Sequence, residues 1–347
     1  MDVASERSNH LIRALRYATP SLAICATLAA TLATSCAAAP LSHGSKARSK
    51  TVAPANRSLS GARFYVEPGT TAARTASDWA SSDPTGAALM QTIAAQPQAR
   101  WFDGSSDTTD ITQYVNDAAA ANAVPILVAY DLPGRDCGGY SSGGAGTDSA
   151  YRSWIRSFAA AIGSHRAAVV LEPDALPELG CFSPARQRSV LALLRYAVGV
   201  VGALPRSVIY IDAGNDQWQP ASVMAARLRA AGVAHARGFS LNVSNFLYTA
   251  DETAYGPSIS RLLGGKPFVI DTSRNGVGPT ADHQWCNPTG RGLGHAPSTR
   301  TGVRRLDAYL WIKAPGESDG TCNGGPDAGV WWPNYAVGLA QRAKLSG

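Results

Sequence analysis

The sequence predicts an α/β fold, a TIM-like parallel β/α barrel of seven or eight strands formed by a single domain. Short apolar segments alternate with helical patterns from about Gly61 onward, which is typical of parallel strands with helices packed outside them. Polar residues, above all carboxylates, follow several apolar segments, as they do where the carboxyl ends of parallel strands meet. The 347 residues, 45% of them hydrophobic, suffice for one such domain.

The expected strands and helices alternate along the whole domain. We expect strands at residues 63–66, 100–102, 124–129, 167–171, 207–211, 238–243, 267–270 and 308–312. We expect helices at residues 86–95, 151–163, 185–201, 222–231 and 258–263, between several of these strands. Seven or eight units of this kind favour closure into a barrel over an open sheet.

Residues 169–176, VVLEPDAL, hold the clearest strand that ends at a carboxylate. Four apolar residues predict a buried strand, and Pro173 ends it because proline has no N–H to donate. Asp174 alone could simply cap the next turn. Carboxylates also follow four other expected strands. Charged residues of an ordinary surface would be scattered along loops and helices. One cleft at the strand carboxyl ends, lined by carboxylates, therefore explains the pattern better. The acidic residues at these strand ends are Asp131, Asp136, Glu172, Asp174, Asp212, Asp271, Glu317 and Asp319.

The N-terminal segment carries most of the charge. Residues 1–57 contribute +5 of the formal +6, so the pI of about 9.1 does not indicate nucleic-acid binding. Three arginines, an apolar run at 22–33 and small residues at 35–39 predict an export signal over residues 1–39. The run is shorter than the roughly 20 residues of a spanning helix, so no stable membrane span is expected. Residues 40–60 are expected to be a disordered linker, with the domain at 61–347.

Cysteine usage fits a secreted protein. Cys36 weakly resembles a lipoprotein processing site, but the usual Leu three residues earlier is missing, so lipid anchoring is the less favoured alternative. Beyond the signal, four cysteines predict two disulfides, and three pairings are possible. Pairing Cys137 with Cys181 and Cys286 with Cys322 would tie the loops of this cleft together. Because the chain has no CxxC, HxH or HExxH pattern, neither a metal site nor a cofactor is expected.

Several carboxylates without metal ligands, together with many aromatic residues, indicate glycoside hydrolysis. This reaction needs one carboxylic acid to protonate the leaving oxygen and one carboxylate that acts on water or on the sugar carbon. Sugar rings also stack on flat aromatic surfaces. Trp101, Trp218 and Trp285 flank polar loop residues and suit this role, whereas Trp311 lies within a strand and is as well explained by core packing.

Six segments then carry a family resemblance: YDLPGRDCG, VVLEPDAL, IYIDAGN, DTSRNG, WCNPTGRGLG and LWIKAPGESDG. In this order, over roughly residues 61–340, they resemble the signature blocks of glycoside hydrolase family 6, and of its secreted actinobacterial members in particular. This family comprises cellulases, both endoglucanases and cellobiohydrolases. The resemblance implies a distorted β/α barrel with its cleft at the strand carboxyl ends. It also implies inverting hydrolysis of β-1,4-glucan or cello-oligosaccharides. We expect the protein to be a monomer.

The resemblance assigns roles to four carboxylates. Asp174 matches the general acid, and Asp136 matches a second aspartate that raises the acid's pKa and relays a proton from water. A nearby like charge keeps an acid protonated. Asp319 matches the proposed base, whose role is debated within the family. Asp212 matches a central aspartate whose role is less settled.

Other residues match positions around the reacting sugar. Tyr130 matches a tyrosine that distorts the sugar ring, and Ser142 a loop serine that positions the attacking water. Lys313 and Glu317 match residues that hold the sugar hydroxyls. The residues that we expect to contact substrate are Trp101, Arg135, Asn215, Trp218, Asn242, Asn275 and Trp285.

Asn215 departs from the family pattern, which commonly has His after Asp-Ala-Gly. Asn still forms hydrogen bonds but has no titrating ring. It is the only support for a second hypothesis, a non-catalytic β-glucan-binding protein. Residues 139–143 also fit the G-x-S-x-G pattern of serine esterases, but they lie in a Gly/Ser-rich loop and not between a strand and a helix. Short intervals between the paired cysteines favour an open cleft, hence an endoglucanase over a cellobiohydrolase.

Overall fold

The computed structural model describes residues 58–345, whose centre is one sheet of seven parallel strands in sequential order. The strands are β1 (Arg100–Phe102), β2 (Ile126–Ala129), β3 (Ala168–Leu171), β4 (Val208–Asp212), β5 (Gly238–Leu241), β6 (Phe268–Asp271) and β7 (Leu306–Leu310). The helices are α1 (Thr71–Trp79), α2 (Pro84–Ala94), α3 (Thr108–Ala120), α4 (Asp148–Ile162), α5 (Pro184–Gly202), α6 (Ala221–Ala230), α7 (Thr249–Leu262) and α8 (Pro333–Gln341). The predicted α/β class and curled parallel sheet are confirmed.

The sheet separates two apolar layers because successive strand residues face opposite sides. In β2, Ile126 and Val128 point into the barrel interior, whereas Leu127 joins the outer core beneath the helices. In β3, Val170 lies inside and Val169 outside. Strands buried on both faces are nearly continuous apolar runs, which is why the sequence located them well.

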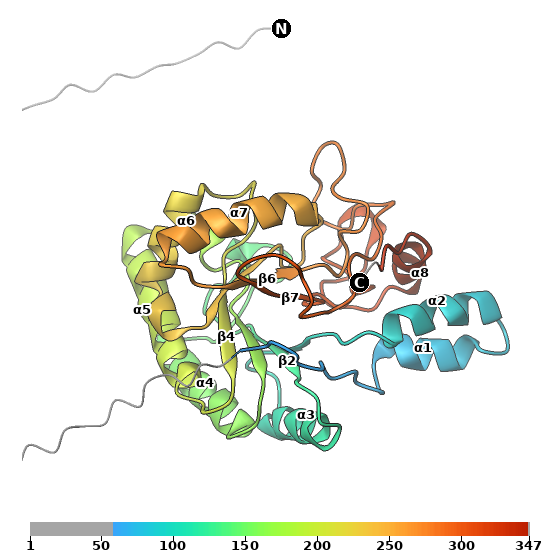
Figure 1. Ribbon diagram of the computed structural model, residues 1–347, viewed down its shortest axis with the longest axis horizontal. Helices are drawn as coiled ribbons and strands as arrows, with labels where there is room; N and C mark the ends of the chain where they lie inside the picture. The colour runs from blue at the N-terminus through green and yellow to red at the C-terminus, as the bar shows by residue number, and fades with distance from the viewer. Residues whose placement is uncertain (1–57, 346–347) are drawn as a thin grey trace, which may run out of the picture. The chain divides into compact units, whose positions relative to one another are not determined.

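The helices follow the strands around the outside of the sheet. Figure 1 shows α3 to α7 in succession along its outer side, where they cover the outer core. Helices α1, α2 and α8 pack instead on one another, in a separate apolar cluster that contains Trp311. The barrel interior is therefore a filled core, and the strand ends remain free to build a site.

No eighth strand completes the barrel within the described residues. The predicted strand at 63–66 forms a single parallel bridge, between Phe64 and Val124, and a turn follows at residues 68–69. The two edges of the sheet meet just beyond β1 and β7. There the Ala99 N–H donates to the Trp311 carbonyl at 2.8 Å, and the Trp101 indole donates to the Ile312 carbonyl at 2.8 Å.

The helix boundaries differ from expectation in two ways. Helices α1, α3 and α8 were not expected, although α3 buries Ile111, Tyr114, Val115 and Ala118 at helical spacing. Helix α7 begins at Thr249, nine residues before its expected start, because Pro257 lies inside the helix instead of preceding it. The other expected helices agree with α2, α4, α5 and α6 within three residues.

The expected export signal, residues 1–39, and most of the expected linker lie outside the described residues. Leu59 is 1% exposed and belongs to the barrel core, so folded structure begins before the predicted boundary at residue 61. Among residues 58–345, no helix is both long and apolar enough to cross a membrane.

Candidate active site

A cleft of about 640 Å³ opens at the carboxyl ends of the strands. Segments within or following all seven strands contribute to its wall, as the alignment of polar strand ends predicts. The predicted site residues that line it are Trp101, Tyr130, Arg135, Asp136, Ser142, Asp174, Asn215, Trp218, Trp285, Lys313, Glu317 and Asp319.

Asp174 lies just beyond β3, directly above Asp212 from β4. Its backbone N–H donates to a carboxylate oxygen of Asp212 at 3.0 Å. Burial raises the pKa of Asp174 well above its ordinary value, and the negative charge of Asp212 raises it further. Burial also raises the pKa of Asp212 to about 6, although N–H donors oppose the shift. This environment suits Asp174 to hold a proton near neutral pH.

Asp136 lies in the short helix η1 (Asp136–Gly138), after β2. Its carboxylate accepts a hydrogen bond from the Ser141 N–H at 2.5 Å. Burial raises its pKa, opposed by this hydrogen bond and by the Arg135 charge. The Arg135 guanidinium lies 4.5 Å from the centre of the Tyr130 ring and also donates to the Tyr130 carbonyl. Arg135 thus fixes the loop that carries Asp136 against the tyrosine.

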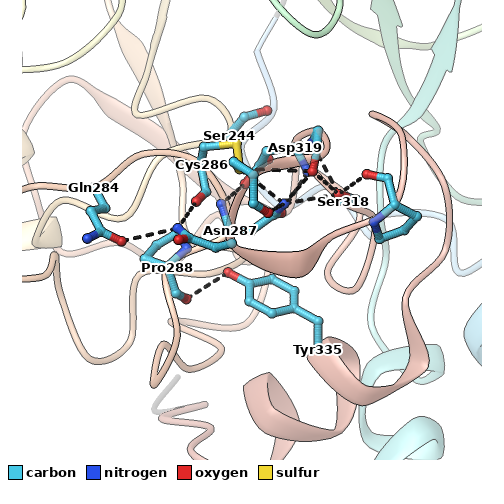
Figure 2. The surroundings of a disulfide bond; sticks show 12 residues. Ser244, Gln284, Cys286, Asn287, Pro288, Ser318, Asp319 and Tyr335 are labelled. Carbon is cyan, nitrogen blue, oxygen red and sulfur yellow. Dashed lines mark hydrogen bonds between the residues drawn. A yellow bond between two sulfur atoms is a disulfide. The ribbon is translucent and has the colours of Figure 1, made fainter.

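Asp319 is held by a buried ion pair. The Nη1 atom of Arg274 lies 2.9 Å from the carboxylate of Asp319, and neither side chain is more than 5% exposed. The backbone N–H of Asn287 donates to the same carboxylate at 3.0 Å. The Asn287 amide oxygen accepts from the Asp319 N–H at 2.8 Å. Asn287 therefore binds both the carboxylate and the backbone of Asp319 (Figure 2).

Asn287 is itself fixed by the segment around Asp319. Its amide N–H groups donate to the Ser318 hydroxyl at 3.1 Å and to the Gly320 carbonyl at 2.7 Å. The neighbouring Cys286–Cys322 disulfide and the 3.1 Å hydrogen bond from Tyr335 to the Pro288 carbonyl complete the surroundings seen in Figure 2. The sequence analysis missed both Arg274 and Asn287, although each lies in a motif that it recognised.

Lys313 and Glu317 form a further ion pair in the cleft, with 3.6 Å between Nζ and Oε2. Burial raises the pKa of Glu317, and the Lys313 charge opposes this shift. Asp271 at the end of β6 accepts the Lys313 backbone N–H at 3.0 Å, which places the start of this segment. The pair offers the cleft a hydrogen-bond donor and an acceptor, and a sugar hydroxyl can bond to either.

The aromatic residues divide between cleft and core. Trp101 meets Tyr130 edge to face, with ring centres 5.2 Å apart. Trp285 is 52% exposed and lies 6.2 Å from the ring of Tyr140, a cleft residue that the sequence analysis did not single out. Trp311 is fully buried, so core packing is its role.

The described chain matches known proteins over nearly its whole length. Residues 59–343 match the glycosyl hydrolases family 6. The chain belongs to this family. Endoglucanase A of Cellulomonas fimi is 44% identical over 285 residues, which are 81% of this chain and 61% of that protein. Endoglucanase 1 of Streptomyces halstedii is 44% identical over 287 residues, 79% of this chain and 87% of that protein.

A solved family 6 structure shows the same fold. The endoglucanase Cel6 from Mycobacterium tuberculosis, in complex with methyl-cellobiosyl-4-deoxy-4-thio-β-D-cellobioside, has a TM-score of 0.79 and 45% identity. The match covers 82% of this chain and 98% of that one. Fungal cellobiohydrolases C match at 31–32% identity over 72–74% of this chain. The chain spans about three fifths of the length of the Cellulomonas protein.

Three predicted site residues of this family 6 chain lie beneath the cleft and not on its wall. Asp212 is 1% exposed and contacts the backbone of Asp174. Asn242 and Asn275 were predicted to bind substrate, but both are buried and both donate to the Leu247 carbonyl, at 3.4 and 2.9 Å. The two amides hold the segment at 243–247, which lines the cleft, and their contact with substrate stays a prediction.

Both disulfides of the preferred pairing are present, Cys137–Cys181 and Cys286–Cys322. The first joins η1 to the short helix η2 (Pro177–Cys181), and the second joins the segment of Asn287 to that of Asp319. Among the described residues, no group of three or more His, Cys, Asp or Glu side chains could hold a metal ion.

The serine of the G-x-S-x-G pattern, Ser141, does not sit at a strand-to-helix turn. Its loop returns on itself, with an antiparallel bridge between Arg135 and Gly143. The Ser141 N–H is engaged by Asp136 and its carbonyl accepts from Arg135 at 3.0 Å. This geometry lacks the elbow that a serine esterase needs.

Proposed function

We propose that this chain is a secreted, inverting endo-β-1,4-glucanase that hydrolyses internal bonds of cellulose or soluble β-glucan. The observation that carries the proposal is the pairing of Asp174, whose pKa is raised by burial and like charge, with the ion-paired Asp319 in one open cleft. One carboxyl group is suited to give a proton, and the other is held in place by its ion pair with Arg274. Such a pair is what glycoside hydrolysis requires.

Asp174 donates its proton to the leaving glucosidic oxygen while water attacks the opposite face of the sugar. Two carboxylates can receive the proton of that water. Asp319 is the candidate base, but accepting a proton would weaken its ion pair with Arg274. Asp136, in the same loop as Ser142 and with a raised pKa, is the second acceptor.

The remaining cleft residues bind and shape the glucan. Tyr130 presses on the reacting sugar from the centre of the cleft, and Lys313 and Glu317 hold its hydroxyl groups. Trp101, Trp218 and Trp285 provide stacking surfaces. Because the developing oxocarbenium ion flattens the ring, contacts that favour a distorted sugar act mainly on the transition state.

The endo mode is favoured by the relatives: the two bacterial endoglucanases share 44% identity with this chain, against 31–32% for the fungal cellobiohydrolases. Export is favoured by the two disulfides, which persist in oxidising surroundings. The non-catalytic alternative rests on Asn215, whose side chain lines the cleft and accepts from the Gln217 N–H at 3.1 Å. Asp136, Asp174 and Asp319 all line the cleft, which favours an enzyme.

The test incubates residues 58–347 with cellohexaose and with a soluble cellulose derivative. We expect early loss of viscosity and a first-formed α-anomer, detected by NMR. Asp174→Ala should abolish most of the release, whereas Asp78→Asn, an exposed residue of α1, should match the wild type. A first-formed β-anomer would contradict inversion. Binding of cellohexaose without release would support the binding-protein alternative, and Asn215→His would then be the next variant.

A further inference from the structure

Glu178 is an acidic residue of the cleft wall to which the sequence analysis assigned no role. It lies in η2, four residues after Asp174, and its backbone N–H donates to the Asp174 carbonyl at 2.9 Å. The bond closes a turn that runs from Asp174, in the left-handed backbone region, into η2 and keeps the two residues close together. Both side chains accordingly line the same cleft.

The negative charges of four other acidic side chains raise the pKa of Asp174. In decreasing order of their effect on Asp174, these are Asp212, Glu178, Asp136 and Asp319. Glu178 therefore repels a negative charge on Asp174 more strongly than Asp136 does, although the family resemblance gives that role to Asp136. Asp212 exerts the largest repulsion, but it lies beneath the cleft, whereas Glu178 lies on its wall.

The surroundings of Glu178 fix its position. The Cys137–Cys181 disulfide ties η2 to the loop of Asp136. Arg227, the cation packed against this turn, donates to the carbonyls of Leu176 at 2.6 Å and Pro177 at 2.9 Å. Burial, followed by the charges of Asp136 and Asp212, raises the pKa of Glu178 to about 7. Glu178 therefore changes charge within the pH range in which Asp174 must keep its proton.

We propose that Glu178 is a positioning residue for the proton-donating step, whose carboxylate keeps Asp174 protonated at neutral and mildly alkaline pH. The inference rests on the proposed glucan hydrolysis. Below about pH 7 Glu178 is mostly neutral and has little effect on Asp174. Above that pH it is charged, and its repulsion opposes ionisation of the acid. Activity thereby persists to a higher pH than Asp174 and its other neighbours would allow.

The test compares Glu178→Gln, which removes the charge and keeps the shape, with the wild type on cellohexaose between pH 5 and 9. We expect the two proteins to have equal kcat at pH 5. On the alkaline side of the pH profile (the upper limb), kcat of the variant should begin to fall at a lower pH than kcat of the wild type. The loss of kcat at pH 8 should be about three- to tenfold, because it withdraws part of a general-acid contribution. KM should change little. An unchanged upper limb would overturn the inference.

A second substrate separates protonation from binding. Dinitrophenyl β-cellotrioside has a leaving group that departs without a proton, so the general acid contributes little to its hydrolysis. Wild type and Glu178→Gln should then show the same pH profile. An equal loss on both substrates would mean that Glu178 acts on binding or on structure, and the inference would be wrong.

Controls distinguish the possible failures. Asp78→Asn removes one exposed charge far along the chain and should leave the profile unchanged. If Glu178→Gln fails to fold, Glu178→Ala is measured in the same way. If the wild type does not hydrolyse cellohexaose, the proposed function itself is wrong. If the wild type is active and Glu178→Gln has the same fall of kcat at high pH, only the role of Glu178 is wrong.

Discussion

At the scale of single residues, several positions in or near the cleft adopt a backbone conformation that non-glycine residues seldom take. The φ angles are +57° at Asp136, +49° at Glu172, +70° at Asp174 and +46° at Asn287. Asp and Asn tolerate this left-handed region better than most residues do. Hydrogen bonds at each position, such as that from the Asp174 N–H to Asp212, hold the conformation in place. Conformations of this kind cost free energy, and they persist where the surrounding structure holds them.

Asn287 provides a test at this scale. Asn287→Ala should lower the free energy of unfolding by about 2–4 kcal/mol, because it leaves buried partners of the amide unpaired and puts Ala in the left-handed region. Asn287→Gly loses the same amide but adopts this backbone readily, so it should cost about 1 kcal/mol less. Both variants should lower kcat strongly and change KM little, because the Asp319 carboxylate and backbone lose hydrogen bonds that position them.

Urea unfolding and cellohexaose kinetics check this expectation, with Asn323→Ala at another left-handed position as the matched control. Asn323 lies outside the cleft wall, so its substitution should alter stability while leaving kcat near the wild-type value. Equal stability of the Ala and Gly variants of Asn287 would contradict the backbone part of the argument.

At the scale of elements, the two disulfides join loops that follow different strands. Cys137–Cys181 couples the loop after β2 to that after β3, and so couples Asp136 to the turn of Asp174 and Glu178. Cys286–Cys322 couples the long β6–β7 connection to the segment that follows β7. Helices and strands fix only the two ends of each loop. The disulfides therefore restrict the middle of each loop.

Removing the first disulfide, as the double variant Cys137→Ser and Cys181→Ser, tests this coupling. The bond closes a loop of 44 residues, and its loss should lower the free energy of unfolding by roughly 4 kcal/mol. The equivalent change at Cys286 and Cys322, 36 residues apart, should cost nearly as much. Differential scanning calorimetry under oxidising conditions measures both. Melting temperatures equal to the wild type would contradict the prediction.

At the scale of the whole molecule, folding raises the pKa of several carboxyl groups. Burial raises the pKa of Glu172 to about 8, that of Glu178 to about 7 and that of Asp212 to about 6. Each of these groups binds its proton more tightly in the folded than in the unfolded chain. Their contribution to stability is therefore present at acidic pH and is lost as the pH rises toward the folded-state value.

The free energy of unfolding should accordingly decrease between about pH 5 and pH 8. Glu172, 1% exposed, accepts the N–H groups of Asp131 and Leu132 at 3.0–3.2 Å. Glu172→Gln keeps an acceptor oxygen but cannot ionise, so it should reduce the slope of stability with pH. Urea unfolding at several pH values measures this slope, with Asp78→Asn as the control. A variant whose stability falls as steeply as that of the wild type would refute the assignment to Glu172.

The sequence by itself determined the layer order, most strand positions and the family. Strands buried on both faces are continuous apolar runs, and their carboxyl ends carry the polar residues, so both signals are local in the chain. The same locality explains why Asp136, Asp174 and Asp319 could be named in advance as members of one site.

Only the tertiary structure decided how these residues act on one another. The Arg274–Asp319 ion pair joins residues 45 positions apart, and Asn287 reaches Asp319 across 32. The burial that raises the pKa of Asp174 comes from the folded surroundings, and Asn242 and Asn275 proved to support the cleft from below. Burial, ion pairing and repulsion depend on distances in space, which spacing along the chain does not specify.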